Sequence, residues 1–168
     1  LKVRTALPKI AIAAIAISLL LIHPVQAASK LPTRIISLSP SATEILYAIG
    51  SGKQVIAVDD LSNYPSEAPI TKLSAFNPNV EALLNYKPDL IILNADATKA
   101  LEVKAALEKL KVKVFLESAP SSPREAYLEI AALGRATGKL SGAQKVISEM
   151  KSKISAAIKS GKTTKKIT

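Results

Sequence analysis

The stretch RIISLSPSATEILYAIG, residues 34–50, passes from a short apolar run directly into small hydroxyl side chains and an acid. Its first part, Arg34 to Leu38, has the apolar and β-branched composition of a strand. Ser41-Ala42-Thr43-Glu44 has the spacing of a capping box, in which a hydroxyl and a carboxylate each accept a backbone N–H at the start of a helix. Gly50 is a residue type that commonly ends a helix. The stretch therefore predicts a strand joined closely to a helix.

The same alternation of strand and helix continues along the chain. Apolar runs predict further strands at Val55–Val58, Leu90–Leu93 and Val112–Phe115. Helical spacing and N-terminal signals predict helices from Asn77 to Tyr86, from Lys99 to Leu110, and onward from a second capping box at Ser122. Short apolar strands that alternate with helices are typical of a parallel sheet covered on both faces. We expect an α/β fold, a three-layer α/β/α lobe with a mainly parallel sheet.

The pattern changes after Gly138. Residues Ser141 to Ile158 have one apolar stripe at helical spacing, which predicts a single long helix. The last four residues, Lys-Lys-Ile-Thr, resemble the beginning of another strand. The expected division is therefore an α/β ligand-binding lobe at 28–138, a long helix at 139–160, and at 161–168 the start of a second lobe that this chain lacks.

Residues 1–27 have the features of a targeting segment. Lys2, Arg4 and Lys9 precede an apolar run from Ile10 to Ile22, and Val25-Gln26-Ala27 offers small residues at a cleavage position. The run is shorter than the roughly 20 apolar residues that a membrane span needs. We expect a signal peptide and a protein exported to the periplasm or the outer face of the cell membrane. An uncleaved anchor is the alternative.

The formal net charge of +10 is unevenly distributed. Residues 28–138 carry equal numbers of acidic and basic side chains, whereas residues 139–168 carry eight lysines against Glu149 alone. With two phenylalanines and no tryptophan in the chain, the α/β part has neither the basic face nor the aromatic platform of a nucleic-acid-binding domain. No nucleic-acid partner is expected. Attraction of the lysine-rich end to an anionic surface is a weaker alternative.

The residue types that several classes of enzyme require are missing. The only histidine is His23, in the targeting segment, and there is no cysteine. A zinc or manganese site and a Ser-His-Asp hydrolase site are therefore not expected. Gly50-Ser51-Gly52-Lys53 lacks the full spacing of a phosphate-binding loop. The pair Asp59-Asp60 is expected to lie in a solvated turn, so we expect no enzyme activity, no metal and no cofactor.

Open α/β sheets bind their ligands at the carboxyl ends of the strands. In this chain those ends are the segments Ser37–Ser41, Asp59–Tyr64, Leu73–Asn77 and Asn94–Thr98. They are rich in short polar side chains, to which Tyr64 and Phe76 add apolar bodies. This composition suits a shallow binding surface for a large ligand.

Over about residues 34–160 the chain resembles the N-terminal lobe of the solute-binding proteins that supply ABC importers with cobalamin, iron-siderophores or haem. The resemblance rests on four motifs: Ser39-Pro40 with Thr43-Glu44, Asn63-Tyr64-Pro65, Asn79-Val80-Glu81, and Lys87-Pro88-Asp89 before an apolar strand. In that family one long helix joins two α/β lobes, and the ligand lies in the cleft between them. The resemblance implies that Ser141–Ile158 is this helix.

The resemblance also implies which residues meet the ligand. It places the amino end of the first helix, with its free amides, on the rim of the cleft. The family has aromatic side chains at the positions of Leu61 and Phe76, and the cobalamin binders have a third at Asn94; only Phe76 is aromatic here. The expected ligand-binding residues are Ser39, Pro40, Ser41, Leu61, Tyr64, Phe76 and Asn94. The ligand stays open among corrinoids, ferric siderophores and haem.

Glu81 is implied to contact a partner protein, because the family's glutamate at this position pairs with arginines of the membrane permease. An acid stabilised near a helix start by the helix dipole is the competing explanation. The expected partners are an ABC permease and one large small-molecule ligand, and the expected state is a monomer. Two other functions remain open, namely an exported sensor or adhesin domain with the same fold and an enzyme built around Asp59 and Asp60.

Overall fold

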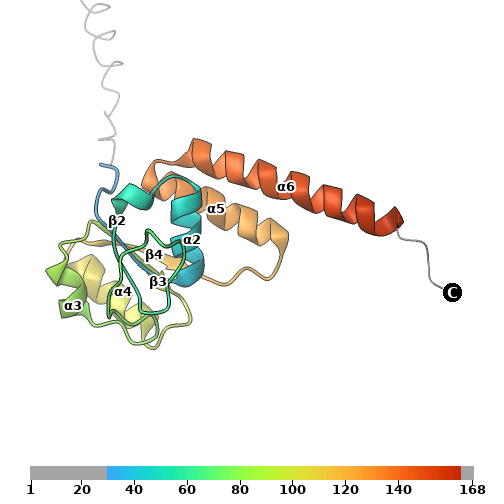
Figure 1. Cartoon of the computed structure of the whole chain (residues 1–168). Coiled ribbons are helices and arrows are strands. Elements are labelled where there is room, and N and C mark those ends of the chain that lie inside the picture. Colours follow the sequence, from blue (N-terminus) through green and yellow to red (C-terminus); the bar gives the residue numbers. More distant parts are fainter. Residues whose placement is uncertain (1–29, 164–168) are drawn as a thin grey trace, which may run out of the picture. The chain divides into compact units, whose positions relative to one another are not determined.

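The computed structural model describes residues 30–163. The expected signal peptide at 1–27 and the expected strand at the carboxyl terminus lie outside these residues. Strands and helices alternate along the described part, which closes with two consecutive helices (Figure 1). No helix among residues 30–163 has the length and apolar character needed to cross a membrane.

The strands of the described part form one four-stranded sheet. They are β1 (Ile35–Leu38), β2 (Val55–Val58), β3 (Leu90–Asn94) and β4 (Lys113–Glu117). All neighbours are parallel, and the order across the sheet is β2-β1-β3-β4 (Figure 1). The central strands β1 and β3 are buried, apart from the last residue of β3. Burial on both faces is typical of parallel strands, and the predicted parallel sheet is confirmed.

Helices cover both faces of this sheet. On one face lie α2 (Pro40–Ala48), α5 (Pro123–Thr137) and the beginning of α6 (Leu140–Thr163), and on the other face lie α3 (Val80–Asn85) and α4 (Ala100–Lys109). Successive residues of β1 point to opposite layers, since Ile35 packs in the core under α2 and α5 and Ile36 in the core under α3 and α4. The predicted three-layer α/β/α class is confirmed.

The start of α2 differs from the prediction. Its N-cap is Ser39, whose Oγ accepts the amide of Ala42 at 3.4 Å, and Pro40 occupies the first turn. The predicted N-cap, Ser41, lies within the helix instead. The residue before a proline favours extended backbone, and proline itself suits the first helical position. Glu44 is therefore too far along the helix to be a capping partner, and its side chain is exposed.

The starts of α3 and α5 depend on the same local geometry. The N-cap of α3 is Asn79, whose side chain accepts a first-turn amide at 2.9 Å, so the predicted cap at Asn77 is wrong. Ser122 caps α5 as predicted and accepts the Glu125 amide at 3.3 Å. The Glu125 carboxylate accepts the amide and hydroxyl of Ser121, each at 2.8 Å, and these bonds hold the pKa of Glu125 below its usual value.

A carboxylate joins the amino ends of β1 and β3. Asp89 accepts the amides of Thr33 and Arg34, both at 2.9 Å, and the Thr33 hydroxyl at 3.0 Å. The Arg34 guanidinium donates to the carbonyls of Tyr86 and Lys87 at 2.6 and 2.9 Å. Burial alone would raise the pKa of Asp89, but the hydrogen bonds from Thr33 and Arg34 outweigh it and lower that pKa. These bonds align the two central strands at their amino ends.

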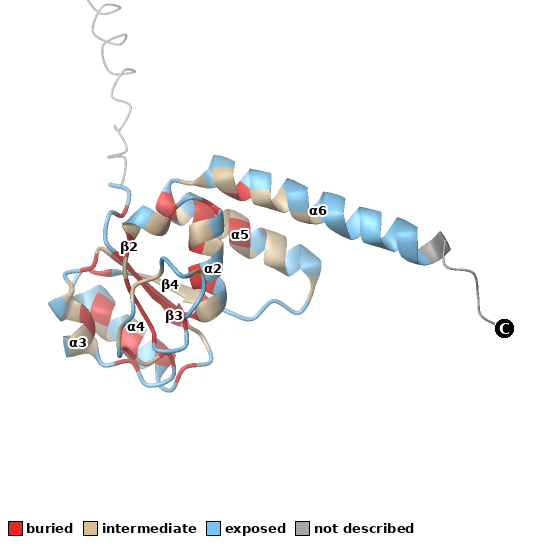
Figure 2. Ribbon diagram, in the orientation of Figure 1, coloured by how far each residue is buried: buried red, intermediate tan, exposed pale blue. Residues whose placement is uncertain are grey.

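Only the first half of α6 is packed. Four side chains, Ala143, Val146, Ile147 and Met150, contact the core formed with α2 and α5. From Lys151 to Gly161 every side chain is exposed, including Ile154 and Ile158 (Figure 2). The predicted apolar stripe is therefore buried along only part of its length. The helix also extends past Ile158, where it was expected to end, to Thr163.

Gly142 allows α6 to cross the end of α2 at close range. A Cβ atom at this position would overlap the carbonyl oxygen of Ile49, the residue that follows α2. The path from α5 into α6 passes through Gly138, whose φ of 74° lies in the left-handed region that favours glycine. These two glycines position α6 relative to α2 and α5.

Candidate functional site

The carboxyl ends of the described strands lie side by side, because all neighbours are parallel and paired. β1 leads into the amino end of α2, and β2 leads into the loop with Leu61 and Tyr64. β3 ends at Asn94, and β4 ends at Glu117. We call this side of the sheet the carboxyl edge. It is the edge at which open α/β sheets bind ligands.

A buried hydrogen-bond network ties α2 to the loop after β2. The Thr43 hydroxyl lies 2.9 Å from the hydroxyl of Ser37 and 3.1 Å from that of Ser62. The Ser62 hydroxyl in turn donates to the Asp59 carboxylate at 2.5 Å. All four residues are buried. Buried polar groups that satisfy one another fix their segments firmly, so this loop has a defined position against α2.

Asp59 does not lie in a solvated turn as expected. Its side chain is buried and accepts the Leu61 amide at 2.9 Å as well as the Ser62 hydroxyl. The expectation is correct for Asp60, which is exposed. Because the oxygens of Asp59 are directed at its own loop, its carboxylate positions Leu61 rather than facing a ligand.

Glu117, which the sequence did not single out, organises the centre of the carboxyl edge. It is 2 % exposed and accepts the hydroxyls of Ser39 at 2.8 Å and Ser41 at 2.7 Å. Ser39 is itself only 1 % exposed, so its side chain serves the helix cap and Glu117 and does not reach solvent. Ser41 is exposed, and Pro40 is partly so. The ligand contacts expected at this helix start are therefore available from Pro40 and Ser41 only.

Three large apolar side chains project into solvent near the carboxyl edge. Their exposed fractions are 49 % for Leu61, 65 % for Tyr64 and 56 % for Phe76. The Phe76 carbonyl accepts the Thr98 amide at 2.9 Å, which ties its segment to the loop after β3. Exposed apolar side chains gathered at a ligand-binding edge can cover an apolar ligand face.

Asn94 is partly buried at the end of β3. Its Oδ1 accepts the amide of Asp96 at 2.8 Å, so the side chain supports its own turn. The amide nitrogen of its side chain is the group that this bond leaves for a ligand. Asn94 can therefore act as a hydrogen-bond donor at the carboxyl edge.

A cavity of about 320 Å³ lies between α2, α5 and α6. Ser41 and Tyr64, both expected site residues, line it together with Glu117. Its apolar lining comes from all three helices and includes Ile45, Ile130 and Met150. We call it the α2–α5–α6 cavity. The structure thus brings Ser41 and Tyr64 together in one hollow, and neither sequence spacing nor composition predicted that hollow.

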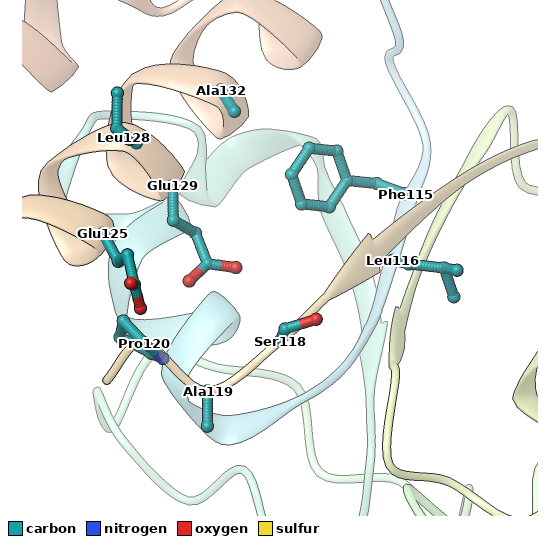
Figure 3. Close-up of a pocket in the computed structure, with 9 residues that line it drawn as sticks. All are labelled: Phe115, Leu116, Ser118, Ala119, Pro120, Glu125, Leu128, Glu129 and Ala132. Atoms are coloured by element: carbon teal, nitrogen blue, oxygen red, sulfur yellow. The ribbon is translucent and has the colours of Figure 1, made fainter. Parts of the chain in front are cut away.

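A second cavity, of about 340 Å³, lies between α5 and the end of β4. Figure 3 shows Glu129 extending from α5 toward Ser118 and Pro120, with Phe115 of β4 nearby. Glu129 lines both cavities. Burial and the charge of Glu117 raise the pKa of Glu129 to about 7, and a hydrogen bond from the Ser118 amide opposes this shift.

Glu81 lies apart from these cavities, in the first turn of α3, with its side chain exposed. α3 packs on the face of the sheet opposite to α2 and α5. The Glu81 carboxylate is placed where the helix dipole of α3 favours a negative charge. Among the described residues, no group of three or more histidine, cysteine or acidic side chains is arranged to hold a metal ion.

Comparison with known proteins gives a consistent family. Residues 35–167 match the periplasmic binding protein family. An uncharacterised ABC transporter substrate-binding lipoprotein of Bacillus subtilis is 33 % identical over 141 residues, which are 82 % of this chain and 44 % of the lipoprotein. A vitamin B12-binding protein of Vibrio vulnificus is 39 % identical over 106 residues, which are 62 % of this chain and 38 % of that protein. The chain thus spans less than half the length of these curated relatives.

Solved structures show the same similarity. A possible iron-binding, periplasmic solute-binding protein of Staphylococcus epidermidis superposes with a TM-score of 0.72 at 33 % identity, over 78 % of this chain and 52 % of that one. Periplasmic haem-binding proteins also share the fold. In each case the described lobe corresponds to about half of the solved chain.

Proposed function

The chain belongs to the periplasmic binding protein family, and from this we propose that it is part of the substrate-binding component of an ABC importer. It captures a corrinoid, a ferric siderophore or haem outside the cytoplasm and delivers it to a membrane permease. It acts by binding alone and carries out no reaction. It works in the periplasm or at the outer face of the cell membrane.

The observation that carries this proposal is the group of exposed apolar side chains near the carboxyl edge, Leu61, Tyr64 and Phe76. Such side chains fit the flat apolar face of a macrocycle or a metal chelate better than a small polar solute. Ser41 and Asn94 supply polar contacts beside them. The fixed loop after β2 keeps Leu61 and Tyr64 in place before the ligand arrives, which lowers the entropic cost of binding.

The remaining parts of the chain have supporting roles in this proposal. Residues 28–138 form the ligand-binding lobe, and residues 139–160 form the helix that joins it to a second lobe. A ligand held between two lobes is buried by both, so this lobe alone binds it more weakly than the pair does. Residues 1–27 direct export, Glu81 contacts the permease, and the protein is a monomer.

Titration with cyanocobalamin, a ferric trihydroxamate and haemin, followed by tyrosine fluorescence or by ligand absorbance, tests the function. We expect saturable binding of one of the three. Phe76→Ala should weaken it by about tenfold, the order of magnitude for loss of one well-placed aromatic contact. Leu110→Ala, which removes a similarly exposed apolar side chain at the end of α4 away from the carboxyl edge, is the matched control and should leave affinity unchanged. If none of the three ligands binds saturably, the proposed function is wrong.

A further inference from the structure

The charged side chains that line the α2–α5–α6 cavity are all acidic. Of the described residues that line it, the charged ones are Glu44, Glu117 and Glu129, and none is a lysine or an arginine. The chain as a whole has a formal net charge of +10, so this local excess of negative charge runs against the overall balance. Carboxylates in a hollow without a cationic side chain attract a positively charged ligand group.

Glu117 is held in a fixed orientation inside this cavity. The hydroxyls of Ser39 and Ser41 each donate to one of its two oxygens. These two donors leave further lone pairs on the same carboxylate, because an ionised carboxylate accepts about four hydrogen bonds. Its burial makes a charged partner more favourable than it would be in water. Glu117 is thus a buried hydrogen-bond acceptor with a fixed orientation, unlike an acid on the surface.

The rest of the lining is apolar and comes from three helices. Ile45 and Ala48 belong to α2, Ala126 and Ile130 to α5, and Val146 and Met150 to α6. The cavity, at about 320 Å³, lies at the small end of the range of about 300–1,000 Å³ that ligand pockets span, and it has room for a short hydrocarbon chain. The cavity therefore suits an apolar arm that ends in a donor group.

We propose that the α2–α5–α6 cavity binds an alkylammonium group, with Glu117 and Glu129 as acceptors for the nitrogen and with Ile45, Ile130 and Met150 around its hydrocarbon part. The inference rests on the proposed function in that the ammonium group is an arm of the transported ligand. Ser41 and Tyr64 line the cavity and are also candidate contacts at the carboxyl edge, so the cavity continues the ligand surface. Cargo with a free amine is favoured, and the two carboxylates of haem are disfavoured at this place.

The raised pKa of Glu129, about 7, agrees with this assignment. It arises from burial and from the neighbouring charge of Glu117, two causes that a bound cation would offset. Binding of an ammonium group should therefore release part of a proton from Glu129 near neutral pH. The other ionisable side chains that line a cavity with Glu129 are Glu117 from β4, Glu44 from α2, Tyr64 from the loop after β2 and Glu125 one turn earlier on α5.

A small probe tests the cavity independently of the cargo. Met150 is the only methionine of the chain, so its ¹³C-labelled methyl group gives one NMR signal inside the cavity. Titration of the full chain at pH 8 with n-hexylammonium should shift this signal saturably, whereas 1-hexanol and hexanoate should bind at least about tenfold more weakly, as expected for a charge-assisted hydrogen bond. Equal affinity for hexanol, or no shift with hexylammonium, would overturn the inference.

Two variants locate the binding. Glu129→Gln should weaken hexylammonium binding by about tenfold, and Ala126→Leu should abolish it by filling the apolar part. Glu102→Gln, on the exposed surface of α4, is the matched control and should have no effect. Glu117→Gln alters the carboxylate that accepts the hydroxyls of Ser39 and Ser41, so its hexylammonium affinity is measured only if the variant folds. The other three variants leave this pair of hydrogen bonds intact.

A matched pair of large ligands then separates this inference from the proposed function. The two are a ferric trihydroxamate with a free terminal ammonium and the same chelate with that amine acetylated. Tighter binding of the ammonium form by about tenfold, lost in Glu129→Gln, supports both proposals. Equal binding of the two forms leaves the transport function standing and overturns the cavity assignment. Binding of hexylammonium without binding of any large ligand supports the cavity assignment and overturns the proposed transport function.

Discussion

At the scale of single residues, the carboxyl edge depends on side chains that look ordinary in the sequence. Glu117 is the last residue of a short strand, and Ser39 and Ser41 belong to a helix start. In its own segment each of these residues looks like an ordinary strand end or helix start. In the fold they form one unit, in which the hydroxyls of Ser39 and Ser41 donate to the buried carboxylate of Glu117. An unpaired buried acid would cost several kcal/mol, so this arrangement is what allows an acid at the centre of the edge.

Glu129 makes stability depend on pH near neutrality. Its pKa is raised from the usual 4.5 to about 7 in the folded chain. The folded state therefore binds a proton more tightly than the unfolded state, and the resulting stabilisation is complete below about pH 4.5 and is lost as pH rises through 7. Urea unfolding should show that the natural chain loses free energy of unfolding between pH 5 and pH 8, and that Glu129→Gln loses less of it over the same range. An identical pH dependence for both proteins would contradict this.

At the scale of elements, the sequence predicted what local patterns determine. The strands lie where apolar runs were found, since a buried parallel strand requires such a run. The cap of α5 was predicted because Ser122, Pro123 and Glu125 stand at the spacing of a capping box. The caps of α2 and α3 were each misplaced by two residues, the first too late and the second too early, because several side chains near each start can act as caps and backbone geometry chooses among them.

The candidate site was less accessible to sequence reasoning. Tyr64 and Phe76 were predicted to be the apolar parts of a shallow binding surface at the strand ends, and the structure shows both side chains to be exposed. Glu117 and Glu129 were missed because burial of an acid depends on which residues from distant segments meet it. The residue type alone does not separate an acid that ends a strand, or an acid on a helix face, from a solvated one. The signal that the sequence offers is position, namely an acidic residue where the strand or helix pattern expects an apolar one.

Two glycines of α6 provide a matched test of its packing. Gly142→Ala puts a methyl group against the Ile49 carbonyl, so we expect a loss of about 1–3 kcal/mol in the free energy of unfolding. Gly161→Ala meets no atom within 4 Å and should stabilise the helix by about 0.5–1 kcal/mol. Thermal or urea unfolding of both variants checks the pair. Similar effects of the two substitutions would mean that α6 does not cross α2 closely.

At the scale of the whole described part, stability is concentrated in the two layers on the sheet. Each layer has its own buried cluster, and α6 shares in one of them only as far as Met150. The remaining turns of α6 have exposed side chains throughout, and a helix without packing partners is marginal in water. This difference divides α6 into a stable and a weakly stable half.

Amide hydrogen exchange should resolve the two halves of α6. We expect strong protection in β1, in β3 and in α6 up to Met150, and exchange at least about tenfold faster from Lys153 onward, because helices without packing open locally at little free-energy cost. Mass spectrometry of peptides from each half gives the measurement. Uniform protection along α6 would show that another part of the protein covers its second half.

The crossing at Gly142 also has a mechanical consequence. At 1.5 Å per residue, the 24 residues of α6 make a rod about 36 Å long, of which the part up to Met150 is packed. A tilt of the whole helix by about 5° at the Gly142 crossing would move its far tip sideways by about 3 Å. The close contact between Gly142 and the Ile49 carbonyl thus helps to determine the direction of the α6 axis. A small change in the angle of α6 at this crossing would therefore become a large displacement of any group attached to the far end of the helix.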